Sequence, residues 1–180
     1  MSLLARGLNV VALAAVIGVL IVLLWFQFAR GELPCALCLV QRAAFIAAGL
    51  GFLLNVRFGS SESHYGIVIV SAMGGAAVAG RQVLLHIATS SRLSGPVVFG
   101  VHFETWALIA FCTIVLFCGA MLFVESQFVE GVRDVRPHAL AQYASWLFVV
   151  IALGYAVSAL LVCGVGVCAE NPTGYQLPWK

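Results

Sequence analysis

Charged side chains are scarce in this chain. Only 9% of its 180 residues are Asp, Glu, Lys or Arg, whereas 63% are hydrophobic. Soluble domains carry roughly 25% charged residues, so the composition excludes an ordinary soluble domain and indicates an integral membrane protein. The formal net charge of +2 is too small to indicate nucleic acid or another anionic partner.

The chain also lacks any stretch that would mark a second domain. We find no internal repeat, low-complexity tract or soluble segment, so residues 1–180 are expected to form one integral membrane domain. The uncharged run from Gly7 to Ala29 has 23 residues. A signal peptide has an apolar region of only roughly 7–15 residues, so we expect this run to be a retained first span.

Hydropathy predicts an all-α, polytopic transmembrane bundle of about five spans. Each expected span is close to the roughly 20 residues that a helix needs to cross the hydrocarbon core. The expected spans are residues 10–28, 37–56, 65–85, 105–124 and 144–162. Short segments rich in Gly, Ser and Pro connect several of them, at 59–61 and 90–96.

Six cysteines are present, and the first two form a C-x-x-C motif, Cys35 and Cys38, between the first two spans. This spacing brings two sulfurs within bonding range across one turn, so the pair can cycle between dithiol and disulfide. The helix start after Pro34 favours a thiolate, and Arg42, one turn beyond Cys38, adds a fixed cation. A static disulfide or half of a metal site is the alternative.

Cys163 and Cys168 follow the last span. In a continuous helix, residues five apart are separated by about 7.5 Å of rise and point about 140° apart, which forbids a disulfide. A bond between them therefore requires the helix to unwind, and Gly164 and Gly166 supply a permissive backbone. The alternative is two unpaired cysteines near a helix end.

The other two cysteines, Cys112 and Cys118, share the fourth span. Their spacing of six residues corresponds to about 9 Å of helical rise, so they cannot bond each other. We expect both to be small, buried hydrophobic side chains.

The number of spans decides which cysteines share a side of the membrane. Both pairs follow odd-numbered spans, so both would emerge on the same side, where a disulfide relay between them is geometrically feasible. Lys and Arg are distributed over both sides, so the positive-inside rule does not decide the orientation. Because disulfides persist in oxidising compartments, we expect the pairs to face the oxidising side.

Residues 24–42 contain three short motifs: Leu24-Trp25-Phe26-Gln27, Pro34-Cys35-Ala36-Leu37-Cys38 and Gln41-Arg42. Together they resemble the first periplasmic loop of the disulfide bond formation protein B (DsbB) family. The resemblance implies a thiol:quinone oxidoreductase of the bacterial inner membrane, with its active cysteines facing the periplasm. It also implies ubiquinone or menaquinone as electron acceptor, and a DsbA-like thioredoxin-fold protein as partner.

The same resemblance implies roles for single residues. Cys38 would face the quinone, Cys35 would exchange with the second pair, and Arg42 would stabilise the thiolate and bind the quinone head group. Four-span members carry their second pair between spans three and four, whereas residues 86–103 contain no cysteine here. The pair at the C-terminal end is the candidate replacement, as an electron relay or, alternatively, as a static brace.

Arg81 and His86 complete the candidate quinone site. Arg81 lies in the last turn of the third span at the depth of Arg42, so both could direct donors at a quinone oxygen or a thiolate. His86, one turn further, could bond a quinone carbonyl or donate a proton. An arginine that snorkels to the interface and a surface histidine are the alternatives.

A second function class also uses cysteine pairs: a membrane protein that binds or transports a soft metal ion. Transport needs pairs on both sides of the membrane, which five spans disfavour, and thiol labelling from each side of intact cells distinguishes the two classes. A structural subunit with incidental cysteines would explain neither the spacing of Arg42 nor the glycines of the second pair.

Overall fold

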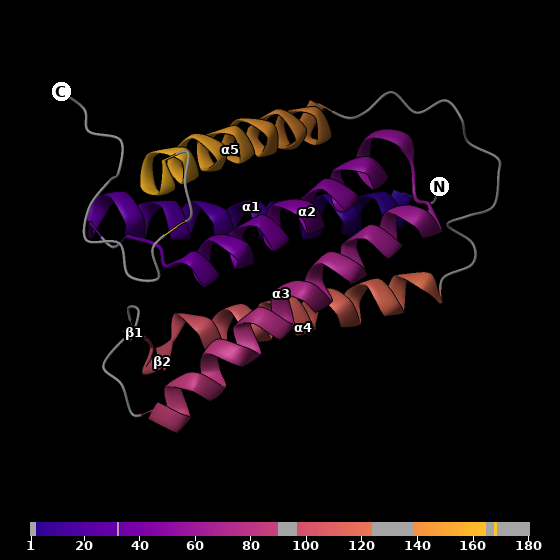
Figure 1. Cartoon of the computed structure of the whole chain (residues 1–180). Helices are drawn as coiled ribbons and strands as arrows, with labels where there is room; N and C mark the ends of the chain where they lie inside the picture. The colour runs from indigo at the N-terminus through magenta and orange to yellow at the C-terminus, as the bar shows by residue number, and fades with distance from the viewer. Residues whose placement is uncertain (1–2, 32, 90–96, 124–138, 165–167, 169–180) are drawn as a thin grey trace.

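The computed structural model describes residues 3–31, 33–89, 97–123, 139–164 and 168. Within these ranges, five helices are long and apolar enough to cross a membrane, which confirms the predicted all-α bundle (Figure 1). The helices are α1 (Leu3–Ala29), α2 (Ala36–Phe58), α3 (Glu62–Thr89), α4 (Phe103–Leu122) and α5 (Ala139–Cys163). Each overlaps a predicted span, and all five begin earlier than predicted, most clearly the first and the last.

The central contact of the bundle joins α2 and α3, which run antiparallel as a hairpin (Figure 1). On its other side α2 packs against α1, and α3 packs against α4. The last helix, α5, lies against α1 and α2, on the side of the bundle away from α4. The C-terminal helix is therefore next to the helices that flank the first cysteine pair.

A buried polar cluster holds the turn between α2 and α3. Gly59 ends α2 with a positive φ of 97°, and its N–H donates to the Asn55 carbonyl at 3.1 Å. The Asn55 side chain accepts the Ser61 N–H and donates to the amide oxygen of Asn9 on α1, both at 3.2 Å. Asn9 in turn donates to the hydroxyl of Tyr65 at 2.7 Å. These bonds satisfy buried polar groups and join three helices at one end.

Two glycines allow helices to approach closely. A Cβ atom at Gly75 of α3 would overlap the ring of Phe111 on α4, and one at Gly49 of α2 would overlap the ring of Phe148 on α5. Phe111 also stacks on Phe45 of α2, with 4.0 Å between ring centroids. Small residues thus let large side chains fill the interfaces, as is common between membrane helices.

A short β-hairpin precedes α4 and was not predicted. Its strands β1 (Val97–Val98) and β2 (Val101–His102) pair antiparallel. Phe99 and Gly100 both have positive φ, 52° and 77°, as a two-residue type I′ turn requires. The indole N–H of Trp106 donates to the backbone of β1 at 3.1 Å, which attaches the hairpin to α4.

Candidate functional site

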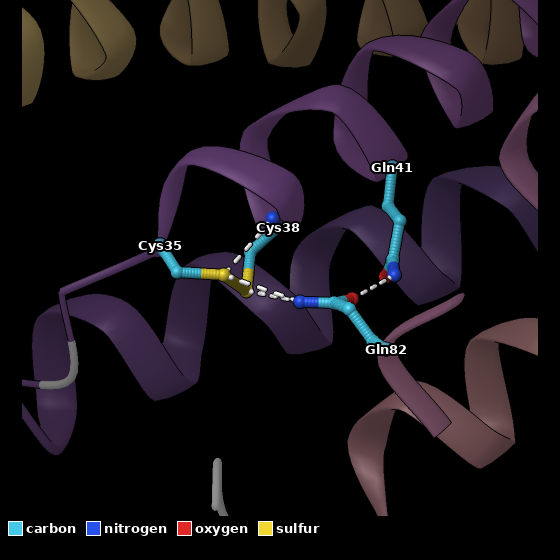
Figure 2. The surroundings of a disulfide bond; sticks show 4 residues. All are labelled: Cys35, Cys38, Gln41 and Gln82. Carbon is cyan, nitrogen blue, oxygen red and sulfur yellow. Dashed lines mark hydrogen bonds between the residues drawn. A yellow bond between two sulfur atoms is a disulfide. The ribbon is translucent and has the colours of Figure 1, made fainter. Parts of the chain in front are cut away.

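The first cysteine pair forms a disulfide at the start of α2, with 5.0 Å between the two Cα atoms (Figure 2). Cys35 is the N-cap residue, with extended backbone at φ −68° and ψ 164°, and the buried Pro34 precedes it. The Sγ of Cys35 accepts the backbone N–H of Cys38 at 3.1 Å, where a capping oxygen is usual. The positive end of the helix dipole therefore points at the disulfide.

A glutamine on α3 faces this disulfide. Gln82 donates from Nε2 to the Sγ atoms of Cys35 and Cys38, at 3.3 and 3.8 Å respectively (Figure 2). Its Oε1 accepts a hydrogen bond from Nε2 of Gln41, one turn into α2. A chain of two amides thus leads from the buried face of α2 to the sulfurs.

The sequence reasoning missed Gln82, although a signal for it was present. Gln41 lies 19 residues before residue 60, at the α2–α3 turn, and Gln82 lies 22 residues after it. At about 1.5 Å of rise per residue, both side chains therefore lie at nearly the same depth in an antiparallel hairpin. Equal depth made a contact between these two polar side chains possible, and the structure shows that it forms.

Arg42 is buried, with 8% of its surface exposed, between α2 and two neighbouring helices. Its Nη1 donates to Oε1 of Gln27 on α1. Its Cζ lies 5.4 Å from the centroid of the Tyr155 ring on α5, a cation–π distance. A buried charge needs such partners, so α1 and α5 hold the guanidinium in place.

The partners of Arg42 also connect α1 to α5. Gln27 donates from Nε2 to the hydroxyl of Ser158 at 2.7 Å, and the hydroxyl of Tyr155 donates to the carbonyl of Leu20 at 2.6 Å. Gln27, Tyr155 and Ser158 are all buried. The fifth helix is therefore fixed to the first by polar contacts near the level of Arg42.

The second cysteine pair also forms a disulfide, with 4.6 Å between the Cα atoms of Cys163 and Cys168. Cys163 is the last residue of α5, and Gly164 adopts a positive φ of 62° while its N–H donates to the Leu160 carbonyl at 2.8 Å. The helix therefore ends where the five-residue spacing required it to end. Gly166, the other predicted break residue, lies outside the described residues.

Both disulfides lie at the same end of the bundle. This end contains the end of α1, the start of α2 and the end of α5 (Figure 1). The arrangement agrees with the prediction from the odd number of preceding spans. The two pairs therefore belong to one surface of the bundle, the opposite end from the α2–α3 turn.

The other predicted quinone ligands lie on α3. Arg81 is exposed, whereas Arg42 is buried against α1 and α5, so the two guanidinium groups occupy different environments. His86 belongs to α3 by its backbone, and its side chain lies outside the described part of the chain. The quinone-binding roles of Arg42, Arg81 and His86 stay predictions.

The remaining cysteines are free and differ in burial. Cys118 is buried as predicted, but Cys112 is exposed, so the expectation of burial was wrong for Cys112. Six positions on a helix turn a side chain by about 240°, which points the two thiols to different faces of α4. Among the described residues, no group of three or more His, Cys, Asp or Glu side chains could hold a metal ion.

Comparison with known proteins agrees with the resemblance in the first loop. The family model described as "Disulfide bond formation protein DsbB" matches residues 5–95. Disulfide bond formation protein B of Cupriavidus metallidurans is 43% identical over 63 residues, which cover 34% of this chain and 39% of that protein. Disulfide bond formation protein B 2 of Pseudomonas syringae pv. syringae is 41% identical over 87 residues, or 46% and 47% of the two chains.

The matched region includes the first disulfide, Arg42 and Gln82, but not α5 with the second disulfide. The chain aligns with less than half the length of these relatives. No solved structure matches. The arrangement of the second pair therefore rests on the geometry described above.

Proposed function

The chain belongs to the disulfide bond formation protein DsbB family, and on this premise we propose that it is a membrane thiol:quinone oxidoreductase. It reoxidises a DsbA-like dithiol protein and passes two electrons to a membrane quinone. The observation that carries the proposal is the presence of two disulfides at one end of a bundle of membrane-spanning helices.

The C-terminal pair receives the electrons first. A thiolate of the partner attacks the Cys163–Cys168 disulfide, breaks the S–S bond and forms a mixed disulfide. The second thiol of the partner then displaces the sulfur of this chain, so that the partner leaves with a disulfide. Cys163 and Cys168 remain as two thiols. Their position at the end of α5 supports this role.

The electrons then move to the first pair by a second exchange. A thiolate of the C-terminal pair attacks Sγ of Cys35, and Cys38 leaves as a thiolate. The other C-terminal thiol displaces Cys35, which restores the C-terminal disulfide and leaves two reduced sulfurs on α2. The N-terminus of α2 favours these anions because its N–H groups and its dipole point at them.

The hydrogen-bond donors of Arg42 support its proposed role as a ligand of a quinone head group. The guanidinium of Arg42 has five N–H donors, and the hydrogen bond to Gln27 uses one of them. The others, with Arg81 and His86 as further candidates, would hold a carbonyl oxygen. A bound quinone supplies a two-electron acceptor, and the protein supplies proximity and orientation for the sulfurs.

A quinone suits the energetics of the proposed partner. The established reduction potential of DsbA is about −120 mV, so its reoxidation needs an acceptor of higher potential. The location follows from the same chemistry. We expect the chain in a bacterial inner membrane with both cysteine pairs facing the periplasm, since disulfides persist in an oxidising compartment.

The test is quinone reduction by the purified protein in lipid nanodiscs, with a reduced DsbA-like protein as electron donor and a short-chain ubiquinone or menaquinone as acceptor. We expect turnover by the wild-type chain, turnover at background level for Cys38→Ser, and near wild-type turnover for the control Cys112→Ser. The free, exposed Cys112 makes that control a matched one. Unchanged turnover in Cys38→Ser, or none in the wild type, would contradict the proposal.

A further inference from the structure

The two sulfurs of the first disulfide differ in their hydrogen bonds. Sγ of Cys35 accepts the backbone N–H of Cys38 at 3.1 Å and Nε2 of Gln82 at 3.3 Å (Figure 2). The contact of Cys38 Sγ with the same Gln82 nitrogen is longer, 3.8 Å. Hydrogen bonds to a charged acceptor are stronger than those to a neutral one. The site therefore favours negative charge on Cys35.

We infer that Gln82 is a further catalytic residue, whose amide N–H stabilises the thiolate of Cys35 while this sulfur is the leaving group. The inference rests on the proposed function. In the step concerned, Cys35 is joined to one C-terminal cysteine by a mixed disulfide. The thiolate of the other C-terminal cysteine attacks the sulfur of the C-terminal cysteine that is bonded to Cys35, so the Cys163–Cys168 bond forms. The bond to Cys35 breaks, and its electron pair stays on Cys35 Sγ.

The two donors reach Cys35 from different helices. The N–H of Cys38 belongs to α2 and therefore moves with the cysteine pair, whereas Gln82 belongs to α3. The close packing of α2 against α3 thus sets the distance from the amide to the sulfur. Gln82 is half-buried, so the bond is less exposed to competition from water than a surface contact.

Gln41 acts as a positioning residue for Gln82. It is buried, and its Nε2 donates to Oε1 of Gln82 (Figure 2). Because this bond occupies the oxygen of the Gln82 amide, the nitrogen of that amide is directed at the sulfurs. A sulfur acceptor needs the N–H side of the amide, so the orientation set by Gln41 is the productive one.

The test is the reduction potential of the Cys35–Cys38 couple. It is measured in a Cys163→Ser/Cys168→Ser background by equilibration with glutathione at about pH 9, where thiolates are populated. We expect Gln82→Met to shift the equilibrium about tenfold toward the disulfide, which lowers the potential by about 30 mV. Gln82→Glu should lower it further, because an ionised carboxylate cannot donate and repels a thiolate.

Leu84→Met is the matched control, since Leu84 is exposed on the same helix. Gln41→Met should lower the potential less than Gln82→Met. A potential of Gln82→Met equal to that of the control would overturn the inference. If Gln82→Met does not fold, unshifted potentials in both Gln82→Glu and Gln41→Met overturn it. Glutathione is the only redox partner here, so a failure of quinone reduction would affect the proposed function and leave this measurement valid.

Discussion

The contact between Arg42 and Gln27 offers a direct test of how α1, α2 and α5 are held together. We consider Gln27→Met, which keeps the length of the side chain and removes both of its polar groups. The change deprives the buried Arg42 of its acceptor and the hydroxyl of Ser158 of its donor. Both losses occur inside the bundle, where few other partners can replace Gln27.

The expected magnitude follows from these two bonds. A hydrogen bond to a charged group contributes about 1.5–3 kcal/mol, and a neutral one contributes about 1 kcal/mol. Arg42 is only 8% exposed, so the upper part of the first range applies. We therefore expect Gln27→Met to lower the free energy of unfolding by about 3–4 kcal/mol, the sum of the two losses. Phe28→Met is the control, because Phe28 is 63% exposed and should change stability little.

A double-mutant cycle with Arg42→Met isolates the pair. Removing both partners leaves no unpaired buried charge, so the double variant should lose about 2 kcal/mol less than the sum of the single variants. The measurement is reversible unfolding in mixed micelles, followed by circular dichroism. Additive losses within about 0.5 kcal/mol would refute the reasoning, because they would mean that the two side chains do not depend on each other.

Two further predictions use other contacts. Arg42→Gln should raise the KM for quinone about tenfold, since a charge-assisted bond to a carbonyl oxygen is lost; an unchanged KM in steady-state assays would remove Arg42 from the quinone site. Gly75→Ala should lower the free energy of unfolding by about 1–3 kcal/mol because its methyl group overlaps the ring of Phe111. Gly74→Ala, with open space around its Cβ, should not; equal unfolding curves would contradict the observed packing.

Several features could be predicted from sequence because they depend only on how far along the chain, and so along a helix axis, a residue lies. Apolar segments of span length predicted the five helices. Because each cysteine pair follows an odd-numbered span, the sequence also predicted that both pairs lie at one end of the bundle. The spacing of Cys163 and Cys168 required a helix end, and α5 ends at Cys163. The catalytic roles of the four paired cysteines stay predictions until they are measured.

Other features depend on how each helix is rotated about its axis. All five helices are apolar enough on average to cross a membrane, so hydropathy gives their depth but not which face of each helix contacts which neighbour. The sequence therefore predicted that Arg42 and Arg81 lie at similar depths. It did not predict that Arg42 is buried whereas Arg81 is exposed. Burial of Cys112 was wrongly expected for the same reason.

The sequence by itself determined the number of spans and the location of both cysteine pairs at one end of the bundle. Only the tertiary structure decided that Gln82 faces the sulfurs and that Tyr155 of α5 packs against Arg42. Depth in a membrane follows from counting residues at a constant rise along a helix. The rotation of each helix about its axis, and therefore which side chains face a neighbouring helix, depends on interhelical packing and hydrogen bonds between residues distant in the sequence.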